Sequence, residues 1–162
     1  MSTLGGYMFY KGDFSIRGES FKLCNPWNIL RIWSGLSFLP HALSKWVDGG
    51  LNPGTIGFFE KAGFDPAATF VTIAMVSELL VGVMLVLGIA TRYACIAGAA
   101  ILGVATWALI TVKGWGWSWN GGGVEYLVFW SITMLMIAMH EFQIRGRADR
   151  LNRVELDKRD FT

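Results

Sequence analysis

The sequence is low in charged residues. Lys, Arg, Asp and Glu make up 16% of its 162 residues, against roughly 25% in an average soluble domain. The formal net charge of +2 supplies no basic surface to attract phosphates, so we expect no nucleic-acid partner. Apolar residues make up 53% of the chain, a composition that excludes intrinsic disorder. The length corresponds to one domain.

Reactive and metal-binding side chains are also scarce. Cys24 and Cys95 form no C-x-x-C pair and fall on the expected cytoplasmic side, which argues against a thiol oxidoreductase. His41 and His140 fall near opposite membrane surfaces and should not share a haem. His140 and Glu141 are expected to form an interfacial pair that ends the last helix. We therefore predict no catalytic residue of its own, no metal site and no covalent cofactor.

Long uncharged segments are abundant. The twenty residues between Arg92 and Lys113 carry no charge, close to the ~20 that a helix needs to cross a bilayer. A soluble bundle would give each helix a broad polar face, whereas these segments have at most a polar stripe. We predict an all-α, integral membrane four-helix bundle in contact with the lipid bilayer. Its spans cover about residues 26–47, 66–90, 92–112 and 124–140.

Lys and Arg residues gather on one side of the predicted spans. Ten lie in the N-terminal segment, the connection after the second span and the tail, against only Lys61 and Lys113 in the other connections. The positive-inside rule therefore places both termini in the cytoplasm. On this topology residues 1–25 form a cytoplasmic extension, residues 26–141 the membrane domain and residues 142–162 a basic cytoplasmic tail.

Helix boundaries are marked by capping residues. Asn25–Pro26 and Asp65–Pro66 each place a capping side chain before a proline at the first helical position. Gly49–Gly50 and Gly88 are expected to stop the first two helices. Residues 48–65 are rich in glycine and should form a turn between spans.

The first predicted span carries one polar stripe. Arg31, Ser34, Phe38, His41 and Lys45 recur at helical spacing and fall within an arc of roughly 80° at about 100° per residue. An ionisable side chain at mid-bilayer costs roughly 2.5–3.5 kcal/mol. The stripe should therefore face the bundle interior or a partner protein.

Two carboxylates lie in the other spans. Glu78, near the middle of the second span, is expected to pair with Arg31 or His41. Glu125, at the outer start of the fourth span, is expected to pair with Lys45. These five residues form the candidate site, as a ligand-binding group or as a buried charge network.

Three interpretations of this group are open. It can be structural, fixing helix register in a bundle that packs through small residues such as Ala94, Gly98, Ala99 and Gly103. It can line a polar cavity for a small amphipathic ligand, because a quinone carbonyl needs hydrogen-bond donors inside an apolar pocket. It can also form a pathway for protons or small solutes.

Tryptophans mark the expected outer surface. Trp115, Trp117 and Trp119 alternate in the glycine-rich connection 113–123. Because indole rings concentrate among lipid headgroups, we expect an interfacial belt. The alternative is a docking patch for an external partner. Trp107, near the outer end of the third span, joins this group of interfacial or docking aromatics.

Four segments can be compared with a known family pattern: LRIWSGLSFLPHALSKW (30–46), GTIGFFEKAGF (54–64), SELLVGVMLVLGIATRYA (77–94) and EYLVFW (125–130). Together they resemble the DoxX family. The family pattern has an Arg and a later Gly/Ser-Lys in helix one, a Glu in helix two, a Gly-x-x-Thr-Arg turn and a polar start to helix four. These places are taken by Arg31, Ser44–Lys45, Glu78, Gly88 with Thr91–Arg92, and Glu125.

The resemblance implies a multi-pass protein of the bacterial inner membrane. The best-understood members accompany thiosulfate:quinone oxidoreductase, and others belong to membrane oxidoreductase complexes. The implied function is a membrane subunit of such a complex, not catalytic alone, that binds quinone or another small lipophilic molecule. The alternatives are a non-catalytic accessory subunit of a large membrane complex and a carrier of protons or small solutes. The chain departs from the family in having Trp107 and Lys113 where a His is frequent.

Overall fold

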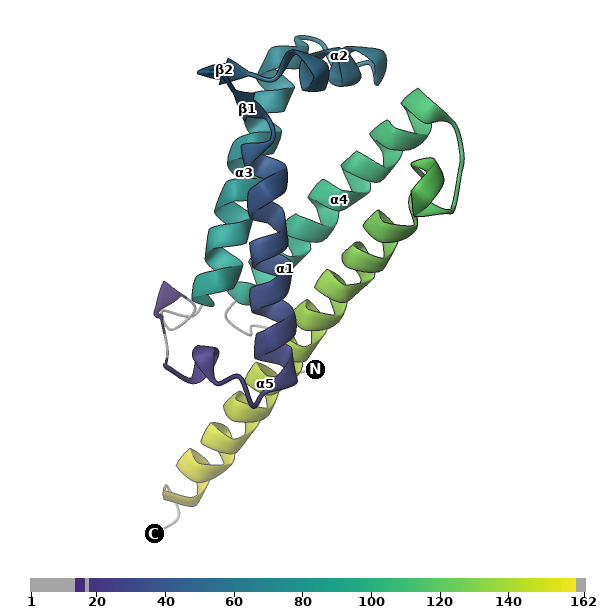
Figure 1. Ribbon diagram of the computed structural model, residues 1–162. Helices are drawn as coiled ribbons and strands as arrows, with labels where there is room; N and C mark the ends of the chain where they lie inside the picture. The colour runs from purple at the N-terminus through teal and green to yellow at the C-terminus, as the bar shows by residue number, and fades with distance from the viewer. Residues whose placement is uncertain (1–13, 17, 160–162) are drawn as a thin grey trace.

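The computed structural model describes the backbone of residues 14–16 and 18–159, and the side chains up to residue 148 and at residue 150. Within this part, the chain is mostly helical, with five α-helices and one two-stranded hairpin (Figure 1). The elements are α1 (Pro26–Leu43), β1 (Trp46–Val47), β2 (Gly50–Leu51), α2 (Pro53–Lys61), α3 (Ala67–Leu87), α4 (Thr91–Lys113) and α5 (Glu125–Arg159).

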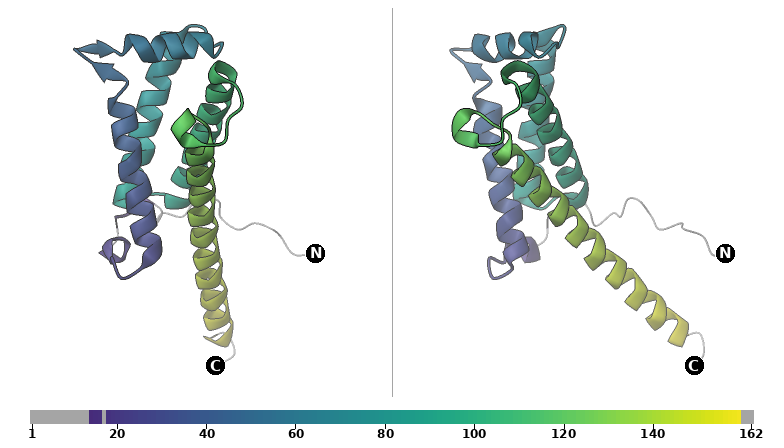
Figure 2. Two further views of the ribbon diagram at one scale, coloured as in Figure 1. Left: turned by 45° about the vertical axis from the view of Figure 1, so that its right-hand side comes forward. Right: turned by 90° about the vertical axis from the view of Figure 1, so that its right-hand side faces the viewer.

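The four long helices form two layers. α1 packs beside α3, and α4 packs beside α5 (Figures 1 and 2). The layers meet at the short α3–α4 turn and diverge toward the opposite end, where α2 lies across the top (Figure 1). We call these the turn end and the α2 end. The hairpin and the α4–α5 loop also lie at the α2 end (Figure 1).

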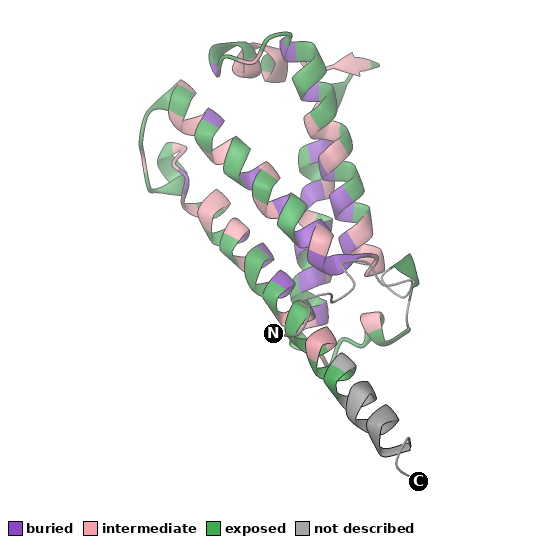
Figure 3. Cartoon of the chain, turned by 180° about the vertical axis from the view of Figure 1, so that it is seen from behind, coloured by how far each residue is buried: buried purple, intermediate pink, exposed green. Residues whose placement is uncertain are grey.

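Three of the described helices are long and apolar enough to cross a membrane. They are α3, α4 and residues Glu125–Ala148 of α5. Their outward faces carry many exposed residues (Figure 3). Apolar side chains such as Leu80, Val104 and Phe129 are among the exposed residues, the pattern expected of helices in lipid. α1 has 18 residues and is not among the three.

Two of the predicted helix boundaries are confirmed, and the predicted cap of α3 is wrong. The Asn25 side chain accepts a hydrogen bond from Trp27 N at 3.1 Å and caps α1. Gly88, with φ 72°, ends α3 in the left-handed conformation. Asp65 does not cap α3, because Pro66 is itself the extended residue before the helix and no side chain caps that end.

α1 is shorter than predicted. It ends at Leu43 and not near residue 47, so Gly49–Gly50 is not its stop. Asp48 and Gly49 instead take positive φ values of 50° and 81°, and they form the tight turn that joins β1 to β2. The Asn52 side chain donates to the Ser44 carbonyl at 3.0 Å and so satisfies one carbonyl of the last turn.

The segment predicted as a turn contains a helix. α2 has nine residues, and the Asn52 side chain caps it by accepting a hydrogen bond from Gly54 N at 2.9 Å. The Asn-Pro signal is the same one that starts α1, and it could have predicted α2 as well. Glycines at positions 54 and 57 weaken helix propensity and concealed the signal.

α5 continues beyond its predicted end. His140 and Glu141 do not end the helix, which has 35 residues and runs to Arg159. The prediction was wrong because hydropathy falls after residue 140 while straight-chain residues, which favour helix, continue. The His140 ring stacks on Trp27, with ring centroids 4.1 Å apart. His140 is therefore far along the bundle from His41, which lies in the last turn of α1.

α1 and α3 touch through glycines. A Cβ atom added at Gly35 would lie 2.8 Å from the Gly82 carbonyl oxygen, and one at Gly82 would lie 2.9 Å from the Gly35 carbonyl oxygen. The two backbones therefore meet directly. On α4, Gly98 packs against the side chains of Met134 and Phe38, whereas Gly103 faces open space.

Candidate functional site

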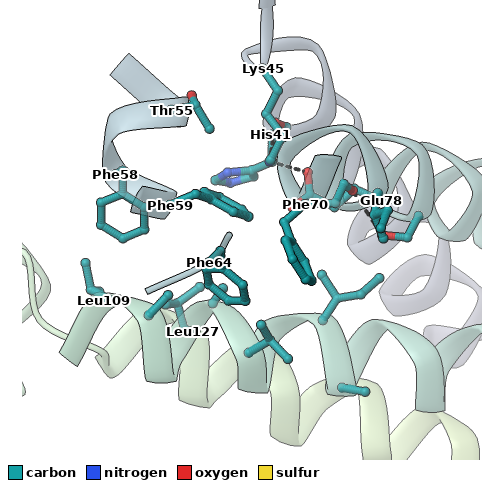
Figure 4. Close-up of a pocket in the computed structure, with 18 residues that line it drawn as sticks. His41, Lys45, Thr55, Phe58, Phe59, Phe64, Phe70, Glu78, Leu109 and Leu127 are labelled. Carbon is teal, nitrogen blue, oxygen red and sulfur yellow. Dashed lines mark hydrogen bonds and ion pairs between the residues drawn. The ribbon is translucent and has the colours of Figure 1, made fainter. Parts of the chain in front are cut away.

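A cavity of about 500 Å³ lies between the two layers beneath α2 (Figure 4). Every helix contributes to its wall, and most of the wall is apolar. The helical residues that line it are His41 from α1; Thr55, Phe58 and Phe59 from α2; Phe70, Ile73, Ala74, Ser77 and Glu78 from α3; Ala100, Ile101, Val104, Ala105, Ala108 and Leu109 from α4; and Leu127 from α5. Lys45 and Phe64 contribute from the connections.

The cavity has one strongly polar group, formed by His41, Lys45 and Glu78. Lys45 Nζ lies 2.5 Å from Glu78 Oε2 and donates to the His41 carbonyl oxygen at 2.9 Å (Figure 4). The side chains of Lys45 and Glu78 are each only 11% exposed. Three of the five candidate residues thus share one site. Glu78 places this site near the middle of the predicted second span.

The predicted charge pairs were wrong. Glu78 pairs with Lys45, not with Arg31 or His41, and Glu125 does not pair with Lys45. The reason is that α1 ends at Leu43. Lys45 therefore lies beyond the helix, and its side chain folds back along the last turn to reach the middle of α3.

Arg31 is at the turn end and does not line the cavity. Its side chain is buried and donates to the carbonyl oxygens of Leu85, Val86 and Ser20. The last carbonyls of a helix have no partner within the helix. Arg31 therefore caps the C-terminal end of α3 and links the segment before α1 to that helix.

Glu125 is the first residue of α5 and contacts the α4–α5 loop. Its carboxylate accepts a hydrogen bond from Trp119 N at 3.4 Å, and its own N–H donates to the Trp117 carbonyl at 3.0 Å. An acidic residue at a helix start is favoured by the helix dipole. The geometry gives Glu125 a role in folding the loop onto the start of α5.

The four candidate tryptophans are exposed. Trp107, Trp115, Trp117 and Trp119 have exposed fractions of 53%, 73%, 54% and 70%. The last three lie in or beside the α4–α5 loop, whereas Trp107 contacts Phe64 with ring centroids 5.6 Å apart. Such exposure suits a ring in the lipid interface and a ring at a docking surface alike.

The aromatic part of the cavity wall was not predicted from the sequence. The Phe59 and Phe70 rings each lie with their centroids 5.1 Å from that of Phe64, while Phe58 extends the row (Figure 4). The F-F pair in residues 54–64 was its signal, but that segment was interpreted as a turn. Among the described residues, no group of three His, Cys, Asp or Glu side chains is placed to hold a metal ion.

Three membrane-length helices indicate a multi-pass membrane protein, and a largely apolar cavity lies between its helices. The DoxX family model matches residues 27–111, slightly more than half of the chain. The chain belongs to the DoxX family, as its sequence motifs indicated. The match includes His41, Lys45 and Glu78 and ends before α5. No curated protein and no solved structure matches the chain significantly.

Proposed function

We propose that this protein is a membrane subunit of an oxidoreductase complex and binds quinone or another small lipophilic molecule in the cavity beneath α2. One observation carries the proposal: a mainly apolar cavity of about 500 Å³ has a single cluster of ionisable groups on its wall. Pockets for small apolar ligands have this composition, with few polar groups that fix orientation.

The polar cluster can donate a hydrogen bond to a carbonyl oxygen of the ligand. An ammonium group has three N–H donors, and that of Lys45 uses two of them on Glu78 and on the His41 carbonyl. The third donor is left for a ligand oxygen, and the His41 imidazole adds a second polar group at the same wall. The Phe59, Phe64 and Phe70 rings offer apolar faces to a flat ring.

The proposal includes four spans, with α1 as the fourth, and both termini in the cytoplasm of a bacterial inner membrane. α1 is less apolar than the other spans because of its polar stripe. Arg31, Ser34 and Phe38 of that stripe are buried in the protein. A polar face that is shielded in this way is tolerated at membrane depth.

A second candidate function is a non-catalytic accessory subunit of a membrane complex. It is favoured by the exposed tryptophans of the α4–α5 loop, which offer large apolar surfaces to a partner. On this account, the Lys45–Glu78 pair only fixes the position of α1 against α3.

Native mass spectrometry of the full chain, gently extracted from its source membranes, separates the two. We expect a quinone-sized adduct on the wild type. The adduct should be lost in Glu78→Gln, which breaks the ion pair, and kept in Glu60→Gln, a matched change on the exposed side of α2. Association with large partner subunits and no adduct on any variant would favour the accessory role.

A further inference from the structure

α3 and α4 form one side of the cavity. These helices meet at the turn end and diverge toward the α2 end (Figure 1). Ile73 on α3 is 56% exposed and Val104 on α4 is 53% exposed, yet both residues also line the cavity. Phe70 on the same side is 37% exposed. Exposed residues of both α3 and α4 therefore border the cavity.

Ile73 and Val104 lie at the depth of the hydrocarbon core. Ile73 is six residues into α3, and Val104 is nine residues before the end of α4. At about 1.5 Å per residue, they lie roughly 9 Å and 14 Å from the helix ends. Both helices are among the three that are long and apolar enough to span a membrane. Lipid and not water therefore surrounds these two residues on the outer surface.

Aromatic rings are in contact at two other sides of the cavity. Toward the α2 end, Phe64 joins Phe59 of α2 to Trp107 of α4, with centroid distances of 5.1 and 5.6 Å (Figure 4). Between α1 and α5, the Trp130 ring packs on Phe38 at 4.4 Å and lies 5.7 Å from the His41 ring. A path from water would have to separate these rings.

We infer that the cavity exchanges its ligand sideways with the bilayer, through a portal between α3 and α4 with Ile73 and Val104 as its lips. This inference rests on the proposed function, because it concerns the same site. It specifies that the ligand is a molecule dissolved in the hydrocarbon core, which arrives without crossing the α2 roof. The Lys45–Glu78 group then meets the polar part of a ligand whose remainder can stay in the portal.

The test measures binding of decylubiquinone, a lipid-soluble quinone, to the full chain in nanodiscs. Saturable quenching of tryptophan fluorescence gives the association rate, the dissociation rate and Kd. A larger side chain at the portal, Val104→Phe or Ile73→Phe, should slow both rates about fivefold or more with little change in Kd, because a narrower passage affects entry and exit alike.

Two controls locate the effect. Val83→Phe makes the same change on the exposed surface of α3, where residue 83 is 42% exposed and does not line the cavity, and it should keep the wild-type rates. Ile56→Phe enlarges a residue of the α2 roof that does not line the cavity, and it should keep the association rate.

Saturable binding with unchanged rates in both lip variants would overturn the portal and leave the proposed function intact. A slower association in Ile56→Phe alone would assign entry to the roof and would also overturn the portal. Absence of saturable binding in the wild type would overturn the proposed function and the portal together.

Discussion

Lys45 and Glu78 face each other inside a largely apolar cavity and are each only 11% exposed. For a buried ion pair, the loss of one partner leaves an uncompensated charge, whereas replacement of both by apolar residues is often neutral or stabilising. The two kinds of substitution therefore separate the structural role of the pair from its role toward a ligand.

We predict that Glu78→Gln and Lys45→Met alone each lower the free energy of unfolding by about 3–5 kcal/mol. The double variant Lys45→Met/Glu78→Met should regain most of that loss. It should still lack the ligand adduct, because the donor to the ligand oxygen is absent. Thermal unfolding in detergent and native mass spectrometry measure the two properties. If the double variant recovered both stability and adduct, the pair would be purely structural.

At the scale of the elements, the contact between α1 and α3 is set by two glycines. Neither position needs a positive φ, and both are required because each faces the backbone of the other helix. Close approach through small residues is a general means of packing helices in membranes, where apolar burial gives little driving force. This contact fixes the position of α1 along α3. It therefore also sets the position along α3 that the Lys45 side chain reaches.

We predict that Gly35→Ala destabilises the protein by about 1–3 kcal/mol, the usual cost of overpacking. The added Cβ would lie 2.8 Å from both the Gly82 carbonyl oxygen and Leu85 Cβ. Gly103→Ala is the matched control, since no atom lies within 4 Å of its added Cβ, and it should be neutral or stabilising by up to about 1 kcal/mol. Melting temperatures in detergent compare the two. Equal effects at both positions would contradict the direct backbone contact.

For the whole molecule, the turn end and the α2 end should lie on opposite sides of the membrane. The turn end carries the start of α1 and the α3–α4 turn, and the α2 end carries the tryptophan loop (Figure 1). Cys24, just before α1, is exposed, and Cys95 is fully buried. Cys24 is therefore a natural reporter of the turn end.

We predict that a membrane-impermeant maleimide labels Cys24 in spheroplasts only after the membrane is permeabilised. In a Cys24→Ser background, Ser118→Cys in the α4–α5 loop should be labelled without permeabilisation. The reason is the positive-inside rule, which places the basic N-terminal segment and tail in the cytoplasm. Labelling of both positions from the same side would contradict the topology and the assignment of α1 as a span.

The sequence alone determined the membrane character, the family and the local features of the helices. Hydropathy, the Asn25 cap, the Gly88 stop and the stripe that includes Arg31 all depend on neighbours within a few turns of one helix. Three of the five candidate residues also proved to share one site. This part was predictable because the site residues are ionisable, and ionisable side chains near an apolar helix must face the protein interior and not lipid.

Only the tertiary structure decided the partner of each charge and the cavity itself. Lys45 meets Glu78 because α1 stops at Leu43, and Arg31 instead binds carbonyl groups at the end of α3. The cavity exists because two helix layers diverge beneath α2 (Figure 1). The angle between the layers depends on contacts between residues far apart in the chain, and periodicity within one helix contains no information about that angle.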